Sequence, residues 1–379
     1  MSVQRRAADV VVVGPLPPPP GGMANQTQAL CRHLEAEGLR VAVVRTNAPY
    51  RPAWIAGWRG VRALARLLPY LVRLWEAAGR APVMHVMANS GWSWHLMAAP
   101  AVWIGSLRGC SVVVNYRGGQ AAEFFARQWR WVRPTLARAR ALAVPSSFLQ
   151  RVFRQYGREA EILPNLIEPG VERCAPEGGR FLVLVARNLE PIYDVATALE
   201  GFARFAARVP EARLAIAGQG PEAGRLRALA RRLGIAERVD FLGALPHAEL
   251  LRHLARADVL LNTSRVDNSP NALLEACALG VPVASTAAGG IPDIVEDGVS
   301  ALLFPCGDAP AAAAALLRLY QDPALRARLA EQGRRLAEGY RWPAVRRRLF
   351  TLYTRASGGR FRPAAEAEGG HLEAGEGAP

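Results

Sequence analysis

The chain has 379 residues, enough for two domains of ordinary size, and 51% of them are hydrophobic. Its formal net charge is +15 at pH 7, and all 47 basic residues are arginine. A balance this basic favours an anionic partner, such as a membrane surface, a phosphorylated substrate or a nucleic acid. The arginines are scattered along predicted helices and no nucleic-acid-binding motif is visible, so we expect no nucleic-acid partner.

Apolar runs and cysteine usage further limit the class of protein and its cellular compartment. The longest mainly apolar stretch, 91–107, contains His95 and Pro100, so we expect no transmembrane helix. The apolar run near the N-terminus is short and broken by Asp9, which predicts a first strand instead of a signal peptide. Five cysteines without CxxC spacing indicate a reducing compartment, and hence a cytoplasmic protein. The six histidines lack metal-ligand spacing, so no metal site is predicted.

The first 170 residues alternate strand-like and helical patterns. The apolar run 9–14 leads into a loop rich in proline and glycine, then a helical pattern over 24–37 and a strand over 41–44, which is the opening of a parallel α/β sheet. Further strands are predicted at 83–87, 111–115, 141–145 and 161–164, with a helix at 147–156.

Three features of this half are candidates for function. Gly21 and Gly22 would let backbone amides approach an anion, although the loop could instead be a stiff polyproline turn or a ligand for another protein. The stretch 54–75 places arginines and apolar residues on different helical faces, which suits either a membrane interface or a helix packed on the sheet. Arg117, at a strand end, could bind an acidic group of an acceptor or form an ion pair with Glu123.

The second half begins after a segment rich in Pro, Gly and Glu, 165–179, which is the best linker candidate. A strand over 181–186 ends at Arg187. A strand over 214–218 is followed by GQGPEAG, a helix and a strand with Asp240, which imitates a dinucleotide-binding fingerprint. Asp240 does not end its strand and the unit lies in mid-chain, so a nicotinamide cofactor is not favoured. Three C-terminal helices are predicted at 309–319, 323–338 and 342–353.

The most informative stretch is 264–290. Ser269 suits an N-cap, Pro270 suits the first helical position, and Gly280 suits the end, which predicts a helix over 270–279 preceded by a loop with Asp267. The N-terminus of this helix can hold an anion.

Glu275 interrupts the apolar sequence of the same helix, about 7–8 Å along the axis from its first turn. This arrangement suits phosphates at the helix tip and a hydroxyl-rich group beyond them, as in a nucleotide sugar. The plain alternative is a solvent-facing Asp267 with Glu275 reaching solvent from a half-buried helix.

The spacing of Asp267 and Glu275, with the following GVPVAS, AGGIPDIVEDG and ALLFPCGD, resembles the donor-site signature of retaining GT-B glycosyltransferases of family 4. One departure is visible: the first acidic position is usually Glu and is Asp267 here. The resemblance implies an α/β chain of two doubly wound Rossmann-like domains that face a central cleft. We expect an acceptor-side domain at 1–170, a nucleotide-sugar domain at 171–340, a helix at 341–357 that crosses back, and a disordered tail at 358–379.

The same resemblance assigns roles to individual residues. Asp267 would position the sugar, Glu275 would hold the ribose hydroxyls, and Arg187 would neutralise the diphosphate. A lysine expected shortly after Arg187 is replaced by the stretch around Tyr193, and Arg265 is a candidate substitute. The remaining donor-binding candidates are Gly21, Gly22, Gly243, Asn268, Ser269 and Asn271. His247, in the turn after Gly243, is interpreted as a surface residue.

These observations predict a retaining glycosyltransferase that moves a sugar from a nucleotide diphosphate sugar to a hydroxyl, for surface polysaccharide or glycolipid synthesis, without a cofactor. Its expected partners are the donor, a glycan or lipid-linked acceptor and an anionic membrane surface, with a location at the inner membrane face. Two alternatives stay open: a nucleotide-sugar epimerase on the same fold, and a non-catalytic sugar- or lipid-binding scaffold whose donor site has decayed.

Overall fold

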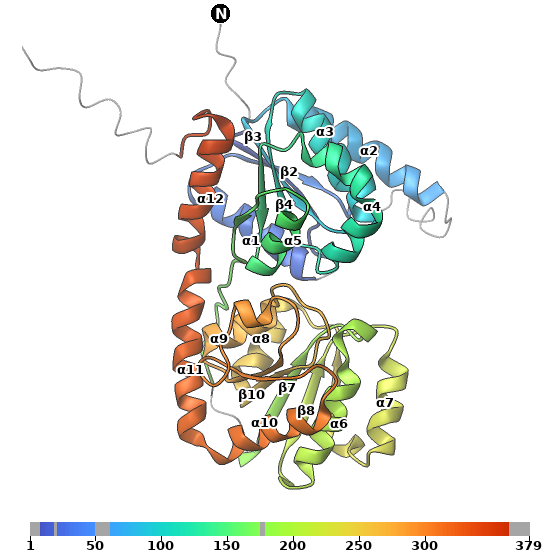
Figure 1. Cartoon of the computed structure of the whole chain (residues 1–379), viewed down its shortest axis with the longest axis vertical. Coiled ribbons are helices and arrows are strands. Elements are labelled where there is room, and N and C mark those ends of the chain that lie inside the picture. Colours follow the sequence, from blue (N-terminus) through green and yellow to red (C-terminus); the bar gives the residue numbers. More distant parts are fainter. Residues whose placement is uncertain (1–7, 19–20, 50–60, 175–178, 364–379) are drawn as a thin grey trace, which may run out of the picture. The chain divides into compact units, whose positions relative to one another are not determined.

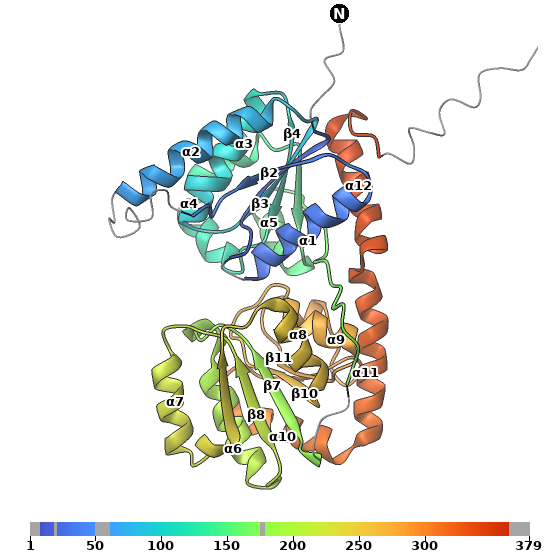
Figure 2. The same cartoon turned by 180° about the vertical axis from the view of Figure 1, so that it is seen from behind.

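The computed structural model describes residues 8–18, 21–49, 61–174 and 179–363, with side chains from 66 onward in the third range. The described residues form two compact units (Figures 1 and 2). The first unit contains the residues up to Pro145, Leu149–Leu163 and the residues from Val345 onward, and the second contains Ser146–Phe148 and Pro164–Ala344. Residues 54–60 of the predicted amphipathic stretch and residues 364–379 of the predicted tail lie outside the described residues.

The first unit is built on a parallel sheet of six strands in the order β2-β1-β3-β4-β5-β6. Strands β1, β3 and β4 are fully buried, as their continuous apolar runs predict for strands covered on both faces. The strands are β1 (Val10–Gly14), β2 (Val41–Arg45), β3 (Val83–Ala88), β4 (Ser111–Tyr116), β5 (Ala141–Val144) and β6 (Glu161–Ile162). The helices are α1 (Gly22–Ala36), α2 (Val61–Ala78), α3 (Ala99–Leu107), α4 (Ala121–Leu136), α5 (Ser147–Gln155) and the C-terminal α12 (Trp342–Ser357).

A series of buried polar contacts connects helix α12 to strands β3 and β4. The Tyr353 hydroxyl lies 2.9 Å from Nδ1 of His85 on β3, and Nε2 of His85 lies 3.1 Å from the Asn115 amide on β4. Burial, together with the positive charge of Arg117, lowers the pKa of His85 to about 3, so the imidazole is neutral. After α12, Phe361 packs against Phe350 and Tyr353, so the first residues of the predicted tail continue the fold.

The second unit is also built on a parallel sheet of six strands, in the order β12-β11-β10-β7-β8-β9. Apolar clusters cover both faces of this sheet. The strands are β7 (Leu182–Ala186), β8 (Arg213–Ala217), β9 (Val239–Gly243), β10 (Val259–Asn262), β11 (Val283–Thr286) and β12 (Leu302–Phe304). The helices are α6 (Val195–Ala206), α7 (Ala223–Arg232), α8 (His247–Arg256), α9 (Asn271–Leu279), α10 (Ala309–Gln321) and α11 (Pro323–Ala337). The predicted α/β class is confirmed in both units.

The strand order of the second sheet reverses between β7 and β10. From β7 the chain proceeds outward through β8 and β9, then returns to β10 on the other side and proceeds through β11 and β12. Connections from β7 and β10 therefore leave on opposite faces, and this leaves a crevice at their carboxyl ends, the usual ligand position in open α/β sheets. Ala186 and Asn262 end these two strands.

The first two glycines of GQGPEAG have a packing role. A Cβ at Gly218 would lie 1.9 Å from the Arg187 carbonyl oxygen, and one at Gly220 would lie 2.3 Å from the Leu189 carbonyl oxygen. The two loops after β7 and β8 approach each other through these glycines. The fingerprint-like spacing is thus explained by loop packing, and Asp240 is exposed on β9.

Candidate functional site

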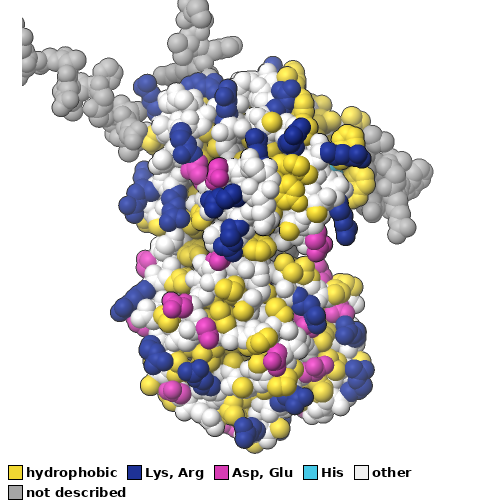
Figure 3. All heavy atoms as spheres, viewed as in Figure 1, with side chains coloured by type: hydrophobic (Ala, Val, Ile, Leu, Met, Phe, Trp, Pro, Cys, Tyr) yellow, Lys and Arg dark blue, Asp and Glu magenta, His cyan; other side chains and the backbone are white. Residues whose placement is uncertain are grey.

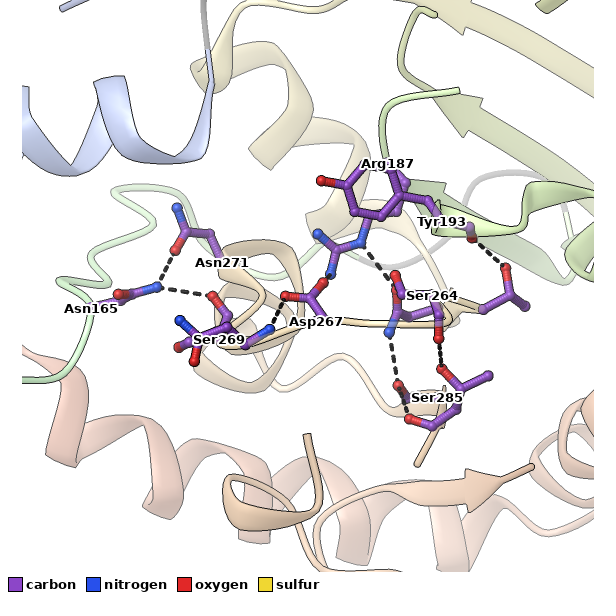
Figure 4. Close-up of polar contacts among 12 residues, drawn as sticks. Asn165, Arg187, Tyr193, Ser264, Asp267, Ser269, Asn271 and Ser285 are labelled. Atoms are coloured by element: carbon purple, nitrogen blue, oxygen red, sulfur yellow. Dashed lines mark hydrogen bonds and ion pairs between the residues drawn. The ribbon is translucent and has the colours of Figure 1, made fainter. Parts of the chain in front are cut away.

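The centre of the site is the guanidinium of Arg187, directly after β7. Its Nε donates to Oδ1 of Asn262 at the end of β10 over 3.0 Å. Its terminal nitrogen forms an ion pair of 2.5 Å with Oδ2 of Asp267, and the two side chains are only 14% and 12% exposed (Figure 4). The pair therefore lies at the point where the strand order reverses.

A polar network fixes the residues behind the pair. The Asn262 amide donates to the Ser285 hydroxyl over 2.9 Å, and the Ser264 hydroxyl donates to Asn262 Oδ1 over 2.8 Å. The Arg187 guanidinium also lies over the Tyr193 ring, 5.3 Å from its centre (Figure 4). Strands β7, β10 and β11 thus hold one cation in a defined position. Sequence reasoning found Arg187 but missed Asn262, Ser264 and Ser285, because isolated polar residues at strand ends carry no motif.

The loop with Asp267 is held by the glycine pair that follows β11. The Gly290 amide donates to the Asp267 carbonyl over 2.8 Å, and the Asn268 amide donates to the Asp267 carboxylate over 2.8 Å. Gly289 has φ 56°, and a Cβ there would lie 2.1 Å from the Asp267 carbonyl oxygen. Burial raises the pKa of Asp267, while Arg187 and the backbone amides oppose that rise.

Helix α9 begins one residue later than predicted. Its N-cap is Pro270, with ψ 115°, and the Pro270 carbonyl accepts the first helical bond from Leu274. The prediction of Ser269 as N-cap was wrong: its hydroxyl oxygen is buried and has no hydrogen-bond partner among the described residues. Asn165 instead fixes the helix start, donating to the Ser269 carbonyl over 3.0 Å and to Asn271 Oδ1 over 2.6 Å (Figure 4). Pro270 itself has no side-chain group that could cap the first amides of α9.

Glu275 is buried on α9, with 7% of its side chain exposed, and it has a partner that sequence reasoning missed. His247, the first residue of α8, places Nε2 2.8 Å from Oε1 of Glu275. The interpretation of His247 as a surface residue was incomplete, since its side chain is 37% exposed but also holds this carboxylate. The signal was available in principle, because a buried carboxylate requires a partner.

The other predicted donor residues of this unit surround these groups. Asn268 is buried, and its side-chain oxygen accepts a hydrogen bond from Ser146. Gly243 ends β9 at φ 72°, and its carbonyl accepts a hydrogen bond from the Gly218 amide over 2.8 Å. Arg265, the candidate substitute for the missing lysine, pairs with Asp194 at 2.9 Å, yet 59% of its side chain is exposed.

The candidates of the first unit lie at the start of α1 and directly after β4. Gly21 is the N-cap of α1, with no side chain of its own to cap the helix, and Gly22 is its first residue. Arg117 follows β4, and its guanidinium lies 3.5 Å from the Gln26 side-chain oxygen of α1. Burial lowers the pKa of Arg117 to about 10.

The described residues contain no group of three or more His, Cys, Asp or Glu side chains placed to hold a metal ion. They also contain no helix with the length and apolar character needed to cross a membrane. The predicted absence of a metal site stays a prediction.

Two family models match consecutive parts of the chain. The model described as Glycosyltransferase Family 4 matches residues 20–171, and the model described as Glycosyl transferases group 1 matches residues 172–336. The chain belongs to the GT-B glycosyltransferases of this group. Membership agrees with the two parallel six-stranded sheets and with the resemblance drawn from the segment after Ser264.

Curated relatives of this glycosyltransferase are diverse. It is 28% identical to the N-acetyl-alpha-D-glucosaminyl L-malate synthase of Bacillus anthracis over 56% of the chain and 55% of that protein. It is 33% identical to the GDP-mannose-dependent alpha-(1-6)-phosphatidylinositol monomannoside mannosyltransferase of Mycolicibacterium smegmatis over 46% of the chain and 48% of the relative. It is 28% identical to the 2-deoxystreptamine N-acetyl-D-glucosaminyltransferase of Streptomyces fradiae over 73% and 72%. The match thus spans about half the length of the first two relatives.

Solved structures share the fold of this glycosyltransferase. The Anabaena protein HepE, in complex with UDP and glucose, has a TM-score of 0.69 at 18% identity and covers 90% of the chain and 98% of its own length. The sucrose-phosphate synthase of Thermosynechococcus elongatus has a TM-score of 0.69 at 20% identity and covers 91% and 98%.

Proposed function

We propose that this protein transfers a sugar from a nucleotide diphosphate sugar to a hydroxyl group, with retention of the anomeric configuration. The observation that carries the proposal is the Arg187–Asp267 pair at the switch point, with Glu275 on the helix that follows. Solved relatives support the donor class, since HepE is described in complex with UDP and glucose.

The proposed roles follow from charge and position. The leaving diphosphate is anionic, and its departure is stabilised by Arg187 and by the dipole and backbone amides at the N-terminus of α9. Glu275, fixed by His247, accepts hydrogen bonds from the ribose hydroxyls. Arg265, with a largely exposed guanidinium beside the loop after β7, is the second cation available to the diphosphate.

Retention follows from chemistry on one face of the sugar. The bond from the anomeric carbon to the diphosphate oxygen breaks, and the acceptor oxygen bonds to the same face. The acceptor proton passes to the departing phosphate oxygen, so no enzymic nucleophile is required. Asp267 positions the sugar and stabilises the positive charge that develops on its ring.

The acceptor is proposed to be a glycan or a lipid-linked saccharide, with the enzyme in the cytoplasm at the inner face of a membrane. The relatives motivate this assignment: one is named for a phosphatidylinositol mannoside acceptor, and another is the putative colanic acid biosynthesis glycosyltransferase of Salmonella typhimurium.

The decisive experiment compares wild type with Glu275→Ala. A panel of UDP-, GDP- and ADP-sugars is first screened for an increase in Tm, and the best donor is then supplied with a radiolabelled sugar. We expect hydrolysis or transfer of the label by wild type and little by the variant. NMR of the product should show the donor's anomeric configuration.

The alternative of a non-catalytic scaffold is favoured by one observation, the stretch around Tyr193 in place of the lysine that the family resemblance implies. A scaffold would show an increase in Tm with a donor but no turnover with any acceptor or with water. The same panel therefore separates the two functions.

A further inference from the structure

Three neighbouring helices of the first unit present an apolar surface outward. On α2, Leu68, Val72 and Trp75 are exposed at positions i, i+4 and i+7, which places them on one face of the helix. Trp103 and Leu107 on α3 and Trp131 on α4 are also exposed. These six residues are the α2–α4 surface.

The contacts between the helices make this surface continuous. The Tyr70 hydroxyl of α2 donates to the Met97 carbonyl just before α3, over 2.7 Å. The Trp103 indole of α3 donates to Thr135 of α4 over 3.0 Å. Figures 1 and 2 both show α2, α3 and α4 side by side.

An arginine guanidinium lies over the ring of each tryptophan of the α2–α4 surface. The guanidinium of Arg108 lies 4.8 Å from the centre of Trp75, that of Arg138 lies 3.8 Å from Trp103, and that of Arg130 lies 5.1 Å from Trp131. Between residues 61 and 138 the sequence has ten arginines and two acidic residues. Figure 3 shows apolar and basic side chains intermixed over these helices.

We propose that the α2–α4 surface binds the surface of an anionic lipid bilayer. Tryptophan side chains favour the headgroup level, and leucine and valine reach the acyl boundary below it. The arginines meet anionic headgroups, each strengthening binding by about fivefold. The excess of positive charge favours an anionic bilayer as the partner, since these helices and the strands between them carry ten arginines and only two acidic residues. The membrane surface gives the proposed enzyme access to a lipid-linked acceptor, but vesicle binding itself does not require the proposed activity.

The test is sedimentation of the full-length protein with vesicles. Phosphatidylcholine vesicles with and without phosphatidylglycerol are compared at low and high salt. Wild type is expected to bind the anionic vesicles at least tenfold more tightly, and the difference should shrink in high salt.

Paired variants identify the surface. Arg130→Gln with Arg138→Gln should weaken anionic binding by about 20-fold, and Leu107→Gln with Trp131→Gln by at least about tenfold. The matched controls are on the second unit: Arg231→Gln with Arg232→Gln on α7, and Val299→Gln, which replaces another exposed aliphatic side chain. These controls should keep wild-type binding, and circular dichroism checks the folding of every variant.

Three results would overturn the proposal. The first is that wild type does not bind anionic vesicles, and the second is that the control variants lose as much vesicle binding as the surface variants. The third is that Leu107→Gln with Trp131→Gln abolishes a concentration-dependent self-association of the protein while vesicle binding persists. A change in Tm with nucleotide sugars reports separately on the donor site, so failure of either proposal leaves the other measurable.

Discussion

The carboxylate of Glu275 is the single group on which donor affinity is expected to depend most. Glu275→Gln keeps the size of the side chain and removes its charge. A hydrogen bond to a charged group contributes about 1.5–3 kcal/mol, so we expect a KM for the donor raised by about 10- to 150-fold and a smaller change in kcat. Steady-state kinetics with varied donor checks this, and an unchanged KM would remove Glu275 from the donor site.

His247 should act through Glu275, because its Nε2 lies 2.8 Å from the carboxylate and its side chain is partly exposed. His247→Ala is expected to raise the donor KM several-fold and to lower the free energy of unfolding by about 1–3 kcal/mol, because it leaves a buried carboxylate without its partner. In the Glu275→Gln background the same change should have little further effect, as a double-mutant cycle would show. His253→Ala, on the same helix, is the control. Additive effects of the two changes would contradict a positioning role.

His85 should make the stability of the first unit depend on pH. Its pKa is about 3 in the folded chain and about 6.5 in an unfolded one. Between these values the unfolded chain binds more protons, so the stabilisation is complete above pH 6.5 and is lost as pH falls towards 3.

At pH 4.5 the loss should reach about 2.7 kcal/mol, and it should be much smaller in His85→Gln. Tyr353→Phe, which leaves His85 buried, should keep the wild-type slope. Urea unfolding between pH 7 and 4.5 measures the three slopes. Equal slopes in wild type and His85→Gln would show that another group controls the transition.

The residues of the site differ in how visible they are in the sequence. Arg187, Asp267 and Glu275 stand at positions that a motif marks, and the structure brings Arg187 and Asp267 together. Asn262 and His247 matter only through distant contacts, over 75 and 28 residues of sequence, which no local pattern encodes.

At the scale of elements, the glycine pair after β11 sets the loop that carries Asp267. Gly289→Ala would place a Cβ 2.1 Å from the Asp267 carbonyl oxygen in a backbone with φ 56°. The loop must shift, so we expect a loss of about 3 kcal/mol in stability and a large loss of donor binding.

Gly298→Ala is the matched control for this change. Its φ is 71°, but a Cβ there meets no atom within 4 Å. It should therefore show only the strain of a positive φ, about 1–2 kcal/mol, with donor binding intact. Chemical unfolding and donor titration of both variants test the comparison. Similar losses of binding in the two variants would show that the close approach to Asp267 has no functional role.

The bounds of helices and strands were predicted well where the sequence pattern was strong. They were predicted less well where two neighbouring residues both suit the same helix boundary. Continuous valine-rich runs fixed β1 and β4 to within a residue. At α9, serine and proline are both good helix-start residues, and the tertiary bonds from Asn165 placed the boundary at Pro270. Apolar periodicity located α2 but could not separate packing from membrane contact, because both require the same face.

At the scale of the whole molecule, chain length and the alternation of strand-like and helical patterns were enough to predict two α/β units. The sequence did not reveal which strands are neighbours, and therefore did not show that Ala186 and Asn262 end adjacent strands at a reversal of order. That adjacency arises from long-range pairing of β7 with β10. This pairing brings together the side chains of Arg187 and Asn262, which are far apart in the sequence.

Hydrogen exchange of the full chain can test which loops bind the donor. Ligand at 100 times Kd adds about 2.7 kcal/mol to the stability of the state that binds it. We expect added protection in the loops after β7 and β10 and at the start of α9, where Arg187, Asp267 and the first helical amides lie. If Gly21 and Gly22 contribute amides to the same phosphates, the start of α1 gains protection as well, whereas α2–α4 should not change. Protection confined to the second unit would limit the donor site to that unit, and protection on α2–α4 without change at α9 would contradict the assignment of the site.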